Sequence, residues 1–304
     1  MYDIIIIGSG PAGMTAALYA ARGNLKVAVL EQGAPGGQMN NTSDIENYPG
    51  YELISGPELS MKMYEPLEKF GVENLYGIVT AVEDHGSVKK VITDDDIYES
   101  KTVIVATGAK HRLLTVAGED TYTSRGVSYC AVCDGAFFRG QDLLVVGGGD
   151  SAVEEALFLT RFANKVTIIH RRDELRAQKL LQERAFANDK IEFIWDSVVK
   201  EIKGNDTKVT SVSIENVKTG QVSTQPFGGI FIYVGLDPVS AMVADLGITD
   251  AEGWIPTDEK MQTQKAGIFA IGDVRQKDLR QITTAVGDGA VAAQAAYHYI
   301  VNNF

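Results

Sequence analysis

Apolar runs that end in glycines recur along this chain, and each predicts a buried strand followed by a tight turn. The first run covers residues 3–7, which are mostly isoleucine, and the glycine-rich residues 8–13 (GSGPAG) follow at once. Residues 14–21 favour a helix, and a second apolar run over residues 26–30 ends in Glu31. The pattern therefore predicts a strand, a glycine turn, a helix and a second strand at the start of the chain.

The same order of elements recurs near the middle of the chain. Residues 142–146 are an apolar run, residues 147–152 (GGGDSA) supply the turn, and residues 153–161 favour a helix. The next predicted strand covers residues 165–169 and ends in the basic sequence HRR at residues 170–172. Two such repeats predict an α/β protein with parallel sheets.

Three further apolar runs, over residues 102–108, 228–234 and 267–273, predict additional buried strands. An alanine-rich helix is predicted from about residue 283 to residue 301. The first and last of these runs share one form, a buried strand ending in a turn of small residues.

The domain arrangement follows from two places where the chain is predicted to cross. These are residues 111–115 and the return hinge at residues 235–238 (GLDP). We expect an α/β fold of two Rossmann-like, three-layer domains, one inserted into the other. Residues 1–112 and 239–304 form the first domain, and residues 113–238 form the insert.

Composition narrows the class of protein. With 304 residues, of which 45% are hydrophobic, the chain exceeds the size at which one core usually divides into two. Its formal net charge of −12 disfavours nucleic acid and anionic membranes as partners. No segment approaches the roughly 20 apolar residues that a membrane span needs, and the amino terminus lacks the basic start of a signal peptide. We therefore expect a cytoplasmic protein that binds neither nucleic acid nor membrane.

The first glycine turn has the spacing of a dinucleotide-binding fingerprint. Gly8, Gly10 and Gly13 let the backbone approach a pyrophosphate, whose charge then lies at a helix N-terminus. Glu31 stands about 20 residues beyond the glycines, where a carboxylate can accept hydrogen bonds from an adenosine ribose. The alternative is a glycine turn that only packs helix against strand.

The second turn differs at its end, because arginines replace the acid. Loss of the ribose-binding carboxylate and gain of Arg171 and Arg172 is what a 2′-phosphate requires, so this site is predicted to prefer NADPH to NADH. The alternative is a solvated helix face, which Asp173 and Glu174 would fit.

The chain has two cysteines, Cys130 and Cys133, spaced C-x-x-C between the two fingerprints. A structural zinc site needs four ligands, and the four histidines are scattered, so no metal is predicted. A pair of buried, inert thiols remains an alternative. Asp134 favours a redox role, because a carboxyl beside a dithiol can deliver and remove protons during exchange. The placement suggests that electrons pass from a nucleotide through a flavin to a dithiol.

Taken in order, the motifs resemble those of the bacterial-type, low-molecular-weight thioredoxin reductases along essentially the whole chain. The matching segments are residues 8–13, 35–38 (PGGQ), 46–50 (ENYPG), 106–109 (ATGA), 130–134, 147–155, 170–172, 272–273 and 279–285 (LRQITTA). The resemblance implies a homodimer that binds FAD in the discontinuous domain and NADPH in the insert, and that reduces thioredoxin. It also implies that the insert rotates about the strands near residues 111–115 and 235–240.

The same resemblance assigns roles to residues. Cys133 is expected to lie nearest the flavin, Cys130 to attack the substrate disulfide, and Asp134 to act as acid and base. Asp273 is expected to bind the flavin ribitol chain, and Gln281 with Ile282 to meet the isoalloxazine ring. The implied FAD site comprises Gly8, Gly10, Ala12, Gly13, Glu31, Gly37, Gln38, Asn47, Thr107, Gly108, Asp273, Gln281 and Ile282. The implied NADPH site comprises Gly148, Gly149, Asp150, Ser151, Arg171, Arg172 and Arg176.

Two departures from the family pattern do not contradict the resemblance, and two other functions remain open. Val132 stands where many members have threonine, and Asp150-Ser151 replaces an Asn-Thr pair, so that an acid lies near a phosphate. The chain could reduce another dithiol protein, or it could bind FAD and NADPH as a sensor without turnover. Relatives that reduce ferredoxin or flavodoxin lack a redox dithiol. The presence of Cys130 and Cys133 therefore argues against that function.

Overall fold

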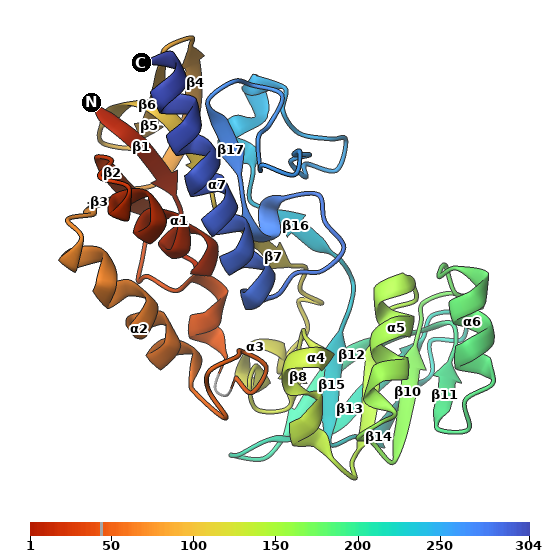
Figure 1. The fold of residues 1–304 in the computed structure, drawn as a ribbon. Helices are drawn as coiled ribbons and strands as arrows, with labels where there is room; N and C mark the ends of the chain where they lie inside the picture. Colours follow the sequence, from red (N-terminus) through yellow and green to blue (C-terminus); the bar gives the residue numbers. More distant parts are fainter. Residues whose placement is uncertain (43–44) are drawn as a thin grey trace. The chain divides into compact units, whose positions relative to one another are not determined.

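The computed structural model describes residues 1–42 and 45–304, and the chain forms two compact units. Residues 1–110 and 237–304 together form one, here called the discontinuous unit. Residues 111–236 form the other, here called the inserted unit. Both are built of parallel sheet covered by helices, which confirms the predicted α/β class (Figure 1).

The chain crosses between the units twice, in segments that pair as a two-stranded sheet. These segments are β7 (Ala109–His111) and β16 (Leu236–Pro238). The predicted boundaries, after residue 112 and before residue 239, lie two residues beyond those at residues 110 and 237. Which cofactor each unit binds stays a prediction.

The discontinuous unit is centred on a seven-stranded sheet. Its middle strands, β1, β2, β6 and β17, are parallel, and β17 comes from near the carboxyl end, so both ends of the chain contribute to one sheet. The strands β4 and β5 add an antiparallel hairpin at one edge. The strands are β1 (Tyr2–Ile7), β2 (Val27–Glu31), β3 (Glu73–Tyr76), β4 (Val79–His85), β5 (Val88–Thr93), β6 (Ile97–Val105) and β17 (Ile268–Ala270).

Both faces of this sheet are buried, which explains the unbroken apolar run at the start of the chain. Ile4 and Ile6 pack beneath helices, whereas Ile5 and Ile7 pack on the opposite face against side chains that include Val82. The long helix α7 lies beside α1 on the helical face (Figure 1), and alanines at the contact let the two approach closely. The helices of this unit are α1 (Pro11–Arg22), α2 (Gly56–Lys69) and α7 (Ile282–Asn303).

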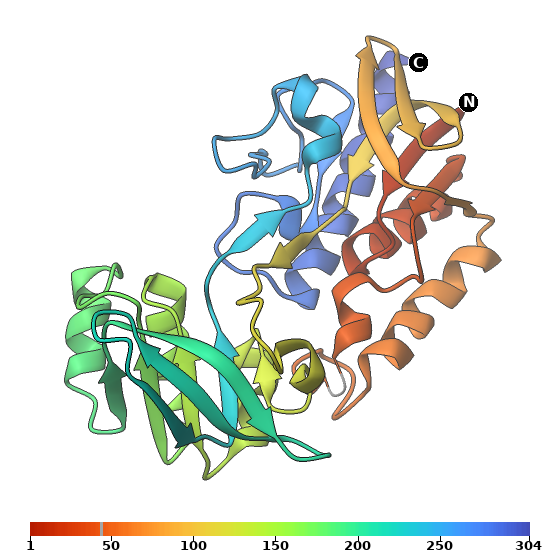
Figure 2. The ribbon, with the colours of Figure 1, turned by 180° about the vertical axis from the view of Figure 1, so that it is seen from behind.

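The inserted unit has a five-stranded parallel sheet in the order β11-β10-β9-β15-β8. Helices α5 and α6 cover one face, and an antiparallel sheet of β12, β13 and β14 covers the other (Figure 2). The parallel strands are β8 (Val127–Ser128), β9 (Asp142–Val146), β10 (Lys165–Ile169), β11 (Ile191–Ile194) and β15 (Gly229–Ile232). The remaining elements are α3 (Glu119–Tyr122), α4 (Ala131–Asp134), α5 (Asp150–Leu159), α6 (Lys179–Phe186), β12 (Ser197–Gly204), β13 (Val209–Asn216) and β14 (Val222–Pro226).

The structure also describes four short 3-10 segments. They are η1 (Gly37–Asn41), η2 (Gly135–Phe138), η3 (Ala241–Leu246) and η4 (Gly272–Val274). Within the part of the chain that the structure describes, no helix is long and apolar enough to cross a membrane.

Candidate functional site

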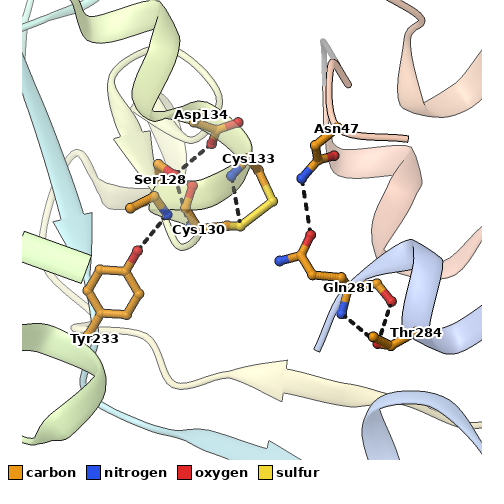
Figure 3. The surroundings of a disulfide bond; sticks show 9 residues. Asn47, Ser128, Cys130, Cys133, Asp134, Tyr233, Gln281 and Thr284 are labelled. Atoms are coloured by element: carbon orange, nitrogen blue, oxygen red, sulfur yellow. Dashed lines mark hydrogen bonds between the residues drawn. A yellow bond between two sulfur atoms is a disulfide. The ribbon is translucent and has the colours of Figure 1, made fainter. Parts of the chain in front are cut away.

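The two cysteines form a disulfide in the inserted unit, at the carboxyl end of its parallel sheet (Figure 3). Cys130 caps the short helix α4, its Cα lies 5.3 Å from that of Cys133, and its Sγ accepts a hydrogen bond from the Cys133 N–H at 3.2 Å. Both residues are half-buried. Sulfurs joined in this way are not thiolate ligands for a metal, and a disulfide at a helix start can be attacked and re-formed.

Asp134 is held beside this disulfide by Ser128. The Ser128 hydroxyl donates to Asp134 Oδ2 at 2.6 Å, and the Cys130 N–H donates to the same hydroxyl at 3.1 Å (Figure 3). Ser128 is the last residue of β8 and is buried. A carboxyl group is therefore fixed on the same short helix as Cys133, and a carboxyl beside a dithiol can exchange protons with it.

Tyr233 holds the segment that carries the two cysteines, residues 130–133. Its hydroxyl accepts a hydrogen bond from the Ala131 N–H at 2.6 Å. Burial, reinforced by the charge of Glu155, raises the pKa of Tyr233 well above its usual value. The phenol thus stays protonated and serves as a fixed polar support.

A buried carboxylate anchors the residue that precedes Cys130. Glu119 accepts hydrogen bonds from the Leu114 N–H at 2.9 Å, the Thr115 N–H at 2.7 Å and the Tyr129 hydroxyl at 2.9 Å. The Tyr129 ring also stacks on His111, with 5.1 Å between ring centres. Residues 114–115, which follow the first crossing between the units, are therefore joined through Glu119 to Tyr129, the residue before Cys130.

The first glycine turn has no room for side chains at two positions and open space at a third. A Cβ on Gly8 would lie 2.5 Å from the Ala106 carbonyl oxygen, and one on Gly13 would lie 1.9 Å from the Gly8 carbonyl oxygen. A Cβ on Gly10, which caps α1, would meet nothing within 4 Å. The turn thus packs tightly behind and is open in front of the helix N-terminus, where an anion is favoured.

Glu31 ends β2, and its carboxylate is already oriented by the backbone. Its Oε2 accepts from the Ser9 N–H at 2.8 Å, and its Oε1 accepts from the Gln32 N–H at 2.8 Å and the Gly33 N–H at 3.2 Å. A carboxylate has about four acceptor positions, so this one can accept further bonds from a ligand hydroxyl.

The loop around Asp273 holds a carboxyl oxygen that lacks a donor. Asp273 Oδ1 is buried and has no hydrogen-bond partner among the described residues, and burial raises the pKa of this carboxyl. The neighbouring Gly272 N–H donates to Asp288 Oδ2 at 3.0 Å, which fixes the loop against α7. A ligand hydroxyl would satisfy the orphaned oxygen, because buried acceptors are normally paired.

Other predicted flavin-site residues are held by contacts within the discontinuous unit. Asn47 Nδ2 donates to Gln281 Oε1 at 3.1 Å, and Gln281 caps α7 just before Ile282 (Figure 3). Gln38 Nε2 donates to the Ala109 carbonyl oxygen at 3.4 Å. These contacts hold the side chains in place before any ligand binds.

Four small residues complete this group. The Thr107 hydroxyl donates to the Val239 carbonyl oxygen, and a Cβ on Gly108, which has a φ of +71°, would meet no atom within 4 Å. A Cβ on Gly37 would lie 3.4 Å from Gly10 Cα, which places the segment at residues 35–38 beside the first glycine turn. Ala12 is buried on α1, and a Cβ on Gly272 would lie 3.0 Å from its methyl carbon.

The second glycine turn repeats this geometry in the inserted unit. A Cβ on Gly148 would lie 2.4 Å from His170 Nδ1, whereas one on Gly149, which caps α5, would meet nothing within 4 Å. The Asp150 carboxylate accepts from Gln178 N–H at 2.7 Å and from Gln178 Nε2 at 3.2 Å. Asp150 therefore ties down the basic loop, and the exposed Ser151 follows it at the start of the helix.

The basic loop presents three arginines to solvent. Arg171, Arg172 and Arg176 are exposed, and their guanidinium groups make no hydrogen bond or ion pair with any residue the structure describes. His170 is buried, and burial together with these three charges lowers its pKa. Its Nε2 also lacks a partner among the described residues. Uncommitted guanidinium groups around a glycine turn fit a phosphorylated ligand.

Sequence reasoning missed Ser128, Tyr233 and Glu119. The contact of Tyr233 with Ala131 joins residues that are distant along the chain. Ser128 and Glu119 lie close to the cysteine pair in the sequence, and the signal for them is only a polar residue within ten positions of its partner. Among residues 1–42 and 45–304, no group of three or more histidines, cysteines and acids is arranged to hold a metal ion.

Comparison with known proteins identifies the family. Residues 2–289 match the pyridine nucleotide-disulphide oxidoreductase family. Thioredoxin reductases from Listeria innocua and Bacillus subtilis are each 55% identical to this chain over 300 residues, which cover 99% of it and 94% and 95% of the relatives. The crystal structure of thioredoxin reductase from Streptococcus pyogenes is 75% identical, covers 99% of both chains and superposes with a TM-score of 0.96. This chain belongs to the thioredoxin reductases of the pyridine nucleotide-disulphide oxidoreductase family.

Proposed function

We propose that this protein takes electrons from NADPH, passes them through FAD to the Cys130–Cys133 disulfide, and reduces the disulfide of a thioredoxin. Membership of the family implies a flavin and a nicotinamide cofactor. The observation that carries the proposal is the half-buried disulfide, with Asp134 beside it, in a chain that also has two glycine turns open at their helix N-termini.

We propose that the discontinuous unit holds FAD. Gly10 leaves room for the pyrophosphate at the start of α1. Glu31 accepts hydrogen bonds from the ribose hydroxyls, and Asp273 Oδ1 accepts one from a ribitol hydroxyl. Gln281 stands at the N-terminus of α7, whose dipole favours negative charge on a nearby ring.

We propose that the inserted unit holds NADPH. Gly149 leaves room for the pyrophosphate at the start of α5, and Arg171 and Arg172 offer exposed guanidinium groups to the 2′-phosphate. Arg176 follows in the same loop, which its own N–H ties to the Gly148 carbonyl oxygen at 2.6 Å. When bound, the two cofactors supply a pair of electrons that opens the protein disulfide.

The chain's own residues then carry the exchange. The Cys130 thiolate attacks one sulfur of the substrate disulfide, forms a mixed disulfide and expels the other substrate sulfur as a thiolate. Cys133 attacks Cys130 Sγ, which re-forms the protein disulfide and releases the second substrate sulfur. Asp134 transfers protons between the cysteines and the departing thiolates, so that a dithiol product leaves.

We further propose that the protein acts as a homodimer in the cytoplasm and that rotation of the inserted unit alternates its access. Support for these points comes from the resemblance of the motifs to those of the bacterial-type thioredoxin reductases.

The test is NADPH oxidation by the purified flavoprotein with thioredoxin and a chromogenic disulfide, beside Cys133→Ser and with NADH as the control nucleotide. The proposal predicts turnover that depends on thioredoxin, that Cys133→Ser abolishes, and that NADH supports poorly. If the flavin is reduced but thioredoxin produces no turnover, the acceptor is another dithiol protein or the chain is a sensor.

A further inference from the structure

We infer that Ser128 is a positioning residue for the redox reaction. It keeps the Asp134 carboxylate ionised and fixes its position relative to the backbone of Cys130. This inference rests on the proposed acid and base role of Asp134. The hydroxyl of Ser128 lies between the carboxylate and the backbone of Cys130, and both contacts appear in Figure 3.

The hydrogen-bonding capacity of the hydroxyl fixes its direction. A serine hydroxyl has one proton to donate. Two acceptors lie within reach, Asp134 Oδ2 at 2.6 Å and the Cys130 carbonyl oxygen at 3.4 Å, and the shorter, charge-assisted contact is the stronger one. The oxygen of the same hydroxyl accepts the Cys130 N–H. Ser128 therefore donates to the carboxylate and accepts from the cysteine.

The rigidity of Ser128 comes from the sheet. It ends β8, which pairs in parallel with β15 so that Ser128 lies opposite Phe231. Only 3% of Ser128 is exposed. A hydroxyl on an edge strand of a packed sheet has few other orientations, so it holds the carboxylate where proton transfer needs it.

Donation to a carboxylate favours its charged form. The other titratable groups around Asp134 come from the elements packed beside α4. They are Tyr233 after β15 and the acids of α5, namely Asp150, Glu154 and Glu155, while residues 135–138 carry none. Tyr233 stays neutral, Asp150 is bound to Gln178, and Ser128 donates to the Asp134 carboxylate at 2.6 Å.

The experiment compares the full-length flavoprotein with Ser128→Ala, Asp134→Asn, the double variant and Ser128→Thr, which keeps a hydroxyl. Ser197→Ala is the matched control, because Ser197 is also buried in the inserted unit but donates to a backbone carbonyl. Thioredoxin reduction is measured between pH 6 and pH 9. The titration of Asp134 is followed separately by infrared spectroscopy, through the acid band that Asp134→Asn removes.

Ser128→Ala is expected to lower kcat about tenfold with KM for thioredoxin unchanged, because Ser128 acts on proton transfer and not on docking. The limb of the pH profile that needs the carboxylate, and the infrared titration, should move up by roughly half a pH unit to one unit. In the Asp134→Asn background, Ser128→Ala should change the rate by less than about twofold. Ser128→Thr should restore most of the activity.

An unchanged infrared midpoint in a folded Ser128→Ala protein would overturn the inference, as would effects of Ser128→Ala and Asp134→Asn that multiply. The infrared result is independent of thioredoxin turnover. A wild-type protein that fails to reduce thioredoxin would therefore contradict the proposed function while leaving this test intact.

Discussion

The two glycine turns share a backbone but differ in the charge at the end of the following strand. The turn of the discontinuous unit is followed by Glu31, whose carboxylate is bound by the Ser9 N–H. The turn of the inserted unit is followed by His170 and the exposed Arg171 and Arg172. The same strand, turn and helix thus present an acid in one unit and exposed cations in the other, so the specificity of each site lies in a few side chains after the turn.

The turns also differ in how they pack behind the helix. A Cβ on Gly13 would lie 1.9 Å from the Gly8 carbonyl oxygen, so no side chain fits there. The corresponding residue of the second turn is Ala152, which is buried, and a Cβ on Gly147 would lie 2.6 Å from its methyl carbon. The second turn accepts this methyl group partly because Gly147 has none. Each turn has its own arrangement of steric constraints.

Exchanging these residues gives the largest expected effect. Gly13→Ala should destabilise the protein by at least about 3 kcal/mol and yield protein without flavin, because the backbone must move to admit the methyl group. Ala152→Gly should cost only about 1–2 kcal/mol, from helix propensity and a small cavity. Urea unfolding and the flavin content of the purified proteins measure both, and equal effects would contradict the packing argument.

Removing the cations tests the electrostatic difference. Arg171→Ala with Arg172→Ala should lower the preference for NADPH over NADH about a hundredfold, since charge-assisted bonds to the 2′-phosphate are lost. The KM for NADH and the flavin content should not change. Arg184→Ala, an exposed arginine on α6, is the control. A preference that survives the double substitution would mean that the phosphate is bound elsewhere.

The open glycines test which unit holds which cofactor. A methyl group at Gly10 or Gly149 meets no protein atom within 4 Å, so neither substitution should prevent folding. Gly10→Ala should weaken flavin retention about tenfold, and Gly149→Ala should raise the KM for NADPH about tenfold, because each methyl group would stand where a pyrophosphate approaches. The opposite pattern would reverse the assignment of the two units.

The smallest predicted effect concerns Glu155 on α5, at a position where α1 has Ala16. Burial, with a smaller contribution from Glu154, raises the pKa of Glu155 from 4.5 to about 7. The folded state therefore holds this proton more tightly than the unfolded state, and the stability due to Glu155 is present below pH 4.5 and lost as the pH rises through about 7. Glu155→Gln should be more stable than the wild type by about 1–2 kcal/mol at pH 8, after allowance for partial exposure, and nearly equal at pH 5.

Unfolding in urea at both pH values measures this difference. The exposed Glu154→Gln is the control and should shift stability by less than about 0.5 kcal/mol at either pH. If the stability of Glu155→Gln relative to the wild type is the same at pH 5 and at pH 8, Glu155 is ionised in the folded protein without a cost in stability.

The parallel core of both units could be predicted from the sequence, but the antiparallel strands could not. The predicted strands at residues 142–146 and 165–169 coincide with β9 and β10, because a strand buried on both faces leaves an unbroken apolar run. Strands such as β12 and β14 alternate with exposed polar residues or are largely exposed, and give no such run. The helix predicted at residues 153–161 instead spans α5, because helical geometry begins immediately after Gly149.

The residues of the candidate site also fall into those that could be predicted from the sequence and those that could not. Residues within a local motif, such as Cys130, Cys133 and Gly10, could be named from their spacing. Tyr233 could not, because its contact with Ala131 joins segments that are distant along the chain. Ser128 is close to Asp134 in the sequence, but spacing alone does not show that its hydroxyl points at the carboxylate.

The proposed electron path requires that the Cys130–Cys133 disulfide exchange electrons with a flavin held by the same protein. An anaerobic reductive titration of the flavoprotein, followed by flavin absorbance and thiol counting, tests this requirement directly. We expect the wild type to take up two electrons for the flavin and two more for the disulfide, and Cys130→Ser with Cys133→Ser to take up only the first two. Equal uptake by both proteins, with the disulfide still intact in the wild type, would contradict the proposed path.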